Sequence, residues 1–113
     1  MYAVIFEFRV KPGQLDAYLG WTERLRERLG KVDGFLSIER FQSLSGEGRY
    51  VSISFWRDRA AVTAWRADPL HANAQAEGKA HVFAEFRLRT AKVVHEITLS
   101  EAGERAERDE TAL

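Results

Sequence analysis

The chain has 113 residues, 45% of them hydrophobic and 12% aromatic, which suits one globular domain with a single core. Its 17 basic and 17 acidic side chains cancel, so no charge excess indicates nucleic acid or an anionic membrane as a partner. The sequence has no cysteine, which excludes disulfides, thiolate metal sites and cysteine nucleophiles. No stretch approaches the roughly 18 apolar residues of a membrane span, and the start lacks the basic region of a signal peptide. We therefore expect a cytoplasmic protein.

The first half of the chain predicts a strand, a helix and a β-hairpin. Residues 2–10 (YAVIFEFRV) are rich in β-branched and aromatic side chains, which favours a strand that the following Pro-Gly pair ends. Residues 14–31 carry one apolar stripe at spacings of three and four, which indicates a helix. Residues 35–43 and 50–56 alternate as strands do, and the short loop between them predicts an antiparallel hairpin.

A second helical region follows, and a proline divides it. The carboxylate of Asp58 can cap its first turn by accepting from free backbone N–H groups. Pro69 disfavours a helical conformation at the residue before it. We therefore expect two helical pieces, residues 59–67 and 69–78, with a bend between them.

The end of the chain predicts one strand and a charged tail. Residues 83–99 are expected to form a single long strand with a bulge, which runs beyond the body of one subunit. The charged residues 100–113 predict a frayed segment or a loosely attached helix. The expected organisation is one domain, residues 1–99, followed by this tail.

The order strand, helix, strand, strand, helix, strand predicts a ferredoxin-like α+β fold, βαββαβ, with an antiparallel sheet and both helices on one face. The other face would carry Val51, Ile53 and Phe55, or their neighbours, into water. A sheet face this apolar is expected to be covered by a partner, and a two-fold homodimer that joins the two sheets is the simplest closure.

Five stretches spread over residues 2–97 carry a resemblance to a known family. They are VKPG, DGFLSIERFQS, SISFWRD, AVTAWRADPLHANAQAEGK and FAEFRLRTAKV, in this order. In sequence and order they resemble the antibiotic biosynthesis monooxygenase (ABM) family, whose fold is a dimeric α+β barrel. The resemblance implies a homodimer that acts with O2 on a small aromatic or quinol-like molecule and needs no cofactor. The family also contains haem-degrading enzymes and many members without a known substrate.

Trp65 and His71 are the predicted catalytic residues. The resemblance implies a tryptophan on the second helix beside a cavity between helices and sheet, and Trp65 fits that position. Its spacing from Val62 and Ala61 suits an ordinary core residue equally well. An imidazole titrates near neutral pH, so His71 can take a proton from a phenolic substrate. The alternative is a polar residue near a helix start that faces solvent or bonds backbone.

The haem-degrading enzymes of the family that this chain resembles share three residues: an Asn in the first strand, a Trp on the second helix and an iron-binding His ten positions after it. Trp65 fits, but Gln75 stands at the His position, and the Asn position falls at or near Phe6. Haem binding is therefore the minority hypothesis. A lone His71 also lacks the second ligand that a metal centre needs, so we predict no metal site.

Five further residues are predicted to bind substrate. Gln75 lies four positions after His71 and shares its helix face, whereas Asn73 points elsewhere. Arg40 is a charge among apolar neighbours, which calls for a partner or a ligand. The aromatic residues Phe6, Phe55 and Phe83 are candidates for the wall of a cavity that takes a flat ligand, although phenylalanines are more often core.

The leading hypothesis is thus a cofactor-independent monooxygenase whose pocket lies between the second helix and the sheet. A non-enzymatic dimer that binds a small ligand in the same pocket is the alternative that the sequence does not separate. No phosphate-binding loop, nucleophile elbow or paired-His motif is present, and no sequence feature supports flavin binding.

Overall fold

The computed structural model describes residues 1–109. In chain order the elements are β1 (Tyr2–Val10), α1 (Leu15–Gly30), β2 (Phe35–Gln42), β3 (Arg49–Trp56), α2 (Arg59–Arg66), α3 (Pro69–Glu77), the π-helical turn η1 (Gly78–Val82), β4 (Phe83–Lys92), β5 (His95–Leu99) and β6 (Arg105–Asp109). The π-helical turn was not expected from the sequence.

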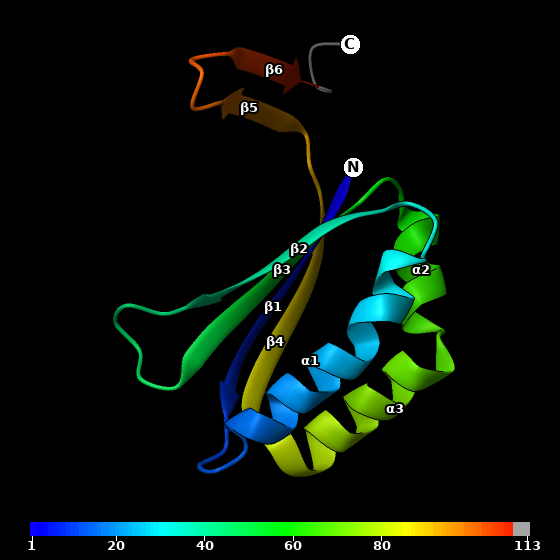
Figure 1. The fold of residues 1–113 in the computed structure, drawn as a ribbon, viewed down its shortest axis with the longest axis vertical. Coiled ribbons are helices and arrows are strands. Elements are labelled where there is room, and N and C mark those ends of the chain that lie inside the picture. Colours follow the sequence, from blue (N-terminus) through cyan, green and yellow to red (C-terminus); the bar gives the residue numbers. More distant parts are fainter. Residues whose placement is uncertain (110–113) are drawn as a thin grey trace.

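A four-stranded antiparallel sheet in the order β2-β3-β1-β4 forms one layer, and the three α-helices form the other (Figure 1). The predicted α+β, ferredoxin-like fold is therefore confirmed. The predicted division of the second helical region is confirmed as well, because α2 ends at Arg66 and α3 begins at Pro69. The hairpin of β2 and β3 extends away from the helices at one end of the sheet (Figure 1).

Strand register decides which side chains face the helices. Phe6 of β1 pairs with Ser52 of β3 and with Leu88 of β4, and these positions share one face because side chains alternate along a strand. Phe8 lies on the same face and its ring contacts Tyr18 of α1, which identifies this face as the one covered by helices. The opposite face, called here the open face, carries the odd-numbered residues of β1 and β3.

Trp56 is the centre of the core between the helices and one end of the sheet. It is only 1% exposed, and its indole N–H donates to the Ser54 hydroxyl over 2.9 Å, so its polar atom is satisfied inside the core. Four other buried residues pack in this cluster: Leu29, Ala61, Val62 and Trp65. The helix layer is thus fixed to the sheet around two tryptophans.

The last strand of the main sheet ends earlier than predicted. Instead of one strand over residues 83–99, β4 stops at Lys92 and β5 begins at His95 in a different sheet. The cause is the length of the neighbouring strand: Lys92 pairs with Tyr2, the first residue of β1, and the N–H of Val93 reaches the carbonyl of Met1. Beyond that point β1 offers no further backbone partner.

The tail prediction of a frayed or helical segment is wrong where the structure describes it. Residues 105–109 form β6, which pairs with β5 in an antiparallel two-stranded sheet. Gly103, at a φ of 83°, adopts the left-handed conformation of the connecting turn, which glycine tolerates best. The hairpin projects from the end of the main sheet (Figure 1). The remaining tail residues, 110–113, lie outside the described part.

Among the described helices, none is long and apolar enough to cross a membrane.

Candidate functional site

The bend between α2 and α3 is held by Asp68. Its carboxylate accepts from the backbone N–H groups of Leu70 and His71, at 2.9 and 3.2 Å, and so caps α3. The same carboxylate accepts from Arg28 of α1 through two nitrogens of the guanidinium, the shorter bond being 2.9 Å. The bend therefore has a fixed geometry, anchored to the neighbouring helix.

This bend brings Trp65 and His71 together. Their rings are stacked, with centroids 4.5 Å apart and an interplanar angle of 20°. Nδ1 of His71 lies 3.1 Å from the backbone carbonyl oxygen of Trp65. Because a carbonyl only accepts, Nδ1 carries a proton, and in the neutral imidazole Nε2 is then the free acceptor. The geometry therefore selects the tautomer.

The surroundings keep His71 neutral. Burial of the imidazole lowers the pKa of His71 below its usual value, and the nearby Arg66 lowers it further. The hydrogen bond to the Trp65 carbonyl and the Asp68 carboxylate act in the opposite direction but do not outweigh burial. At neutral pH the half-buried His71 thus presents an unprotonated Nε2, the form that a general base needs.

Trp65 is 8% exposed, and its indole N–H makes no hydrogen bond with any residue in the described range 1–109. No buried side-chain nitrogen or oxygen in the described residues lacks a partner, so this N–H reaches the surface. This donor is therefore free for a ligand, although the ring itself belongs to the core cluster around Trp56.

Gln75 is half-buried on α3, and Asn73 is exposed, as their spacing from His71 predicts. The residues present do not fit haem ligation. Gln75 and Phe6 occupy the His and Asn positions of the haem-degrading pattern. The His71 ring is stacked on the Trp65 ring, and its Nδ1 bonds the Trp65 carbonyl oxygen. In residues 1–109 no group of three or more His, Asp or Glu side chains is arranged to hold a metal ion.

Phe6, Phe83 and Arg40 lie at the other end of the helix-facing layer. Phe6 and Phe83 meet edge to face with centroids 5.2 Å apart, and Phe83 contacts Tyr18 at 6.0 Å. Arg40 donates from Nε to the Tyr18 hydroxyl over 3.1 Å. Sequence reasoning missed Tyr18, because it read the residue only as part of the apolar stripe of α1; a hydroxyl in such a stripe is the signal that was available.

Phe55 does not join these residues. It pairs with Ala3 of β1, an odd position, and so lies on the open face, where no helix packs. The predicted set is thus divided into three places: Trp65, His71 and Gln75 around the helix bend, Phe6, Phe83 and Arg40 beside Tyr18, and Phe55 on the far side of the sheet.

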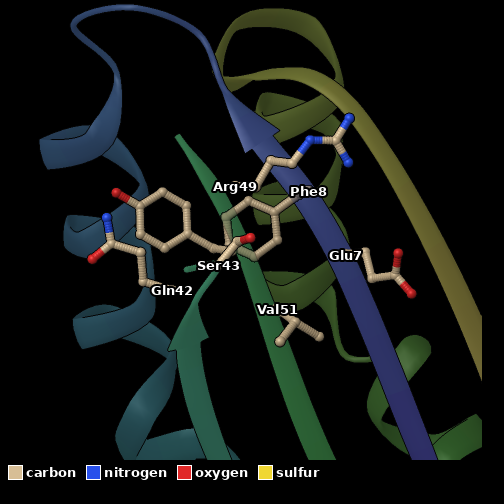
Figure 2. A pocket seen from close by; sticks show the side chains of 7 residues that line it. Glu7, Phe8, Gln42, Ser43, Arg49 and Val51 are labelled. Carbon is tan, nitrogen blue, oxygen red and sulfur yellow. The ribbon is translucent and has the colours of Figure 1, made fainter. Parts of the chain in front are cut away.

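The open face carries charged side chains at one end, and they form ion pairs between strands. Glu85 of β4 accepts from Arg49 at 2.6 Å and lies 3.6 Å from Arg9, while Glu7 pairs with Arg89 at 3.0 Å. Two shallow hollows of about 190 and 230 Å³ share Glu7 and Arg49 in their linings. Figure 2 shows the Arg49 side chain crossing β1 on its way toward β4. Neither hollow includes Trp65 or His71, so the predicted pocket beside α2 is not one of them.

Comparison with known proteins gives this architecture a family. Over 101 residues the chain is 40% identical to jasmonate monooxygenase ABM of Pyricularia oryzae, and the match covers 89% of this chain but 47% of that protein. The chain thus spans about half the length of that relative.

Among solved structures, Rv0793 from Mycobacterium tuberculosis superposes with a TM-score of 0.71 at 22% identity, covering 81% of this chain and 93% of that one. SnoaB, a cofactor-independent oxygenase from Streptomyces nogalater, superposes with a TM-score of 0.69 at 15% identity, covering 81% and 91%. At these identities the two structures show a shared fold. The model of the antibiotic biosynthesis monooxygenase family matches residues 1–77, more than half of the sequence, and the chain therefore belongs to that family.

Proposed function

We propose that the protein is a cofactor-independent monooxygenase that acts on a small, electron-rich aromatic or quinol-like molecule. The observation that carries this proposal is the His71 imidazole, which is stacked on Trp65, tautomerically fixed and neutral, with Nε2 as the free acceptor. Membership of a monooxygenase family and the shared fold with a cofactor-independent oxygenase support it.

In the proposed reaction Nε2 of His71 takes a proton from an acidic C–H or O–H of the substrate. The resulting anion gives an electron to O2, the substrate radical and superoxide combine through a C–O bond, and the proton held on Nε2 of His71 returns to give a hydroperoxide. Loss of water then leaves a carbonyl, so that CH2 and O2 become C=O and H2O. In this proposal the protein deprotonates and orients the substrate, and the Trp65 indole N–H donates to an oxygen of the substrate or the hydroperoxide.

A second candidate substrate follows from the 40% identical relative, whose name states that it acts on jasmonate. Jasmonate is a cyclopentanone that carries a carboxylate, so it also offers an acidic C–H beside a carbonyl. It belongs in the same assay as hydroquinones and anthrones.

The test is oxygen uptake with this substrate panel by the wild-type protein and by His71→Gln and Trp65→Phe variants. The glutamine variant should lose about 100-fold or more, because it removes the base. His81→Gln, at an exposed histidine of η1, is the matched control and should keep the wild-type rate. Wild-type rates in both site variants would remove His71 and Trp65 from the mechanism.

We further propose that two copies pair through their open faces. Phe41 on this face is 43% exposed, and Val51, Ile53 and Phe55 lie half-buried on it. Light scattering after size exclusion should give a dimer, and Ile53→Lys should shift it to monomer. The control is Leu44→Lys, in the loop between β2 and β3, which should leave the dimer intact. A wild-type monomer would contradict this proposal.

A further inference from the structure

The pair of Tyr18 and Arg40 leaves several hydrogen-bond donors without acceptors. Arg40 uses only Nε, which donates to the Tyr18 hydroxyl over 3.1 Å. The tyrosine oxygen therefore accepts this bond, and its own proton is not used by any residue in the described part of the chain. The two terminal amino groups of Arg40 likewise have no acceptor there.

Arg40 differs in this respect from three other arginines of the main sheet. Arg9, Arg49 and Arg89 each lie within ion-pair distance of a glutamate on the open face. Arg40 lies on the sheet face that carries the helices but is itself exposed, and no described carboxylate lies within ion-pair distance of it. A guanidinium without a carboxylate presents a planar, donor-only surface, which suits an anionic oxygen.

A second hydroxyl lies beside this pair. Ser52 of β3 pairs directly with Arg40 of β2 on one side and with Phe6 of β1 on the other. It is 9% exposed, and its hydroxyl makes no hydrogen bond with another described residue. Its neighbour on the same face, Ser54, is by contrast occupied by the Trp56 indole.

Two aromatic rings pack against Tyr18. The Tyr18 ring lies 4.7 Å from that of Phe8 and 6.0 Å from that of Phe83, centroid to centroid. Such rings favour flat, unsaturated ligands over aliphatic ones. The arrangement therefore places an apolar aromatic wall beside the guanidinium, which only donates, and two hydroxyls whose protons have no acceptor in residues 1–109.

We propose that Tyr18, Arg40 and Ser52 form a binding site for the anionic oxygen of a small planar molecule, either an enolate or a carboxylate. This inference rests on the proposed function, which supplies the substrate, and adds that the substrate is negatively charged. The residues recognise the oxygen by charge-assisted hydrogen bonds and are positioning rather than proton-transferring groups.

The experiment is calorimetric titration in oxygen-free buffer at neutral pH with two matched pairs of probes. 2-Hydroxy-1,4-naphthoquinone is an enolate under these conditions, and 2-methoxy-1,4-naphthoquinone is its neutral ether. 2-Naphthoate and methyl 2-naphthoate form the carboxylate pair. The absence of cysteine removes thiol addition to the quinones as a complication. At least one anion should bind about tenfold or more tightly than its neutral analogue, and the pair that does so identifies the anion.

Arg40→Met and Tyr18→Phe should each weaken binding of that anion by about tenfold while leaving the neutral analogue unchanged. Arg40→Lys, which keeps the charge but loses the planar fork, should show a smaller loss. Arg87→Gln, at an exposed arginine of β4, is the matched control and should bind as wild type. Circular dichroism of each variant verifies folding, and Tyr18→Phe, which removes one oxygen only, keeps the test valid if Arg40→Met unfolds.

Equal binding of anion and neutral analogue, no binding at all, or the same loss in Arg87→Gln would overturn the inference. Because no oxygen is consumed, the measurement is independent of turnover. His71→Gln should keep the preference for the anion, so a loss of oxygen uptake with retained anion binding separates the base from the binding site. If Arg40→Met kept both wild-type oxygen uptake and wild-type anion binding, the binding site would be refuted while the proposed function would stand.

Discussion

Gly78 lies where a helix, a π-helical turn and the aromatic end of the sheet meet, and its replacement by alanine tests this packing. The residue is buried, and a Cβ there would lie 2.5 Å from Cε2 and 3.0 Å from Cδ2 of Phe83. The ring is held by Phe6 at 5.2 Å and Phe8 at 5.1 Å, so it has little freedom to yield. Overpacking of this kind costs about 1–3 kcal/mol.

The backbone conformation of Gly78 favours alanine. Gly78 has helical angles, φ −58° and ψ −48°, where alanine is favoured over glycine by about 1 kcal/mol. Subtracting this gain from the upper part of the overpacking range leaves a net loss of about 1–2 kcal/mol, which lowers Tm by roughly 5–10 °C for a domain of this size. Thermal unfolding followed by circular dichroism at one protein concentration measures it.

Gly20→Ala is the matched control, because Gly20 lies inside α1 and an added Cβ would meet no atom within 4 Å. Here only the helix propensity changes, so Tm should rise. Combining Gly78→Ala with Phe83→Leu should cost less than the sum of the two single changes, since the smaller side chain relieves the clash. A Gly78→Ala protein as stable as wild type, or more stable, would refute this account of the packing.

Three further outcomes follow from charged groups. Asp68→Asn should lower Tm at pH 7, because it removes the charge that pairs with Arg28. The pKa of Asp68 is lowered in the folded protein, so the Tm difference from wild type should vanish as pH falls through that pKa, below about 4. The bond to Glu107, 2.8 Å from Nε2, raises the pKa of His95, so the β5–β6 hairpin is more stable below about pH 6.5 and loses that stability as pH rises through the raised pKa. After correction for the intrinsic rise of exchange with pH, the protection of the hairpin amides should therefore fall as pH rises from about 6.5 through the raised pKa, and constant protection would contradict the assignment. The lowered pKa of His71 predicts that oxygen uptake falls on acidification with a midpoint below about 6.5, and a midpoint above that value would contradict a buried base.

The local elements were predictable because their signals are local. The alternation of residues 2–10, the stripe of residues 14–31 and the proline at position 69 each report on neighbours within a few positions. The contact between Trp65 and His71 is local in the same sense, since both residues lie within one bend.

What depends on distant partners was not predictable. The end of β4 is set by the start of β1, and the charged sequence of β6 pairs only because a glycine turn folds it onto β5. The separation of Phe55 from Phe6 follows from the register between β1 and β3, which the sequence of either strand does not state. The bond between Tyr18 and Arg40 likewise needs the placement of α1 over β2.

The first strand of the chain becomes an interior strand of the sheet, and this has a consequence for synthesis. Tyr2 finds its two neighbours at Trp56 and Lys92, so β1 is made before both of the strands that pair with it. Pairings between such remote segments slow folding, because loop closure precedes any gain from the contacts. A nascent chain that stops before β4 exposes an apolar strand edge bearing Val4, Phe6 and Phe8, a template for association with other unfinished copies. Ribosome-stalled or truncated forms that end before β4 should thus be the aggregating species.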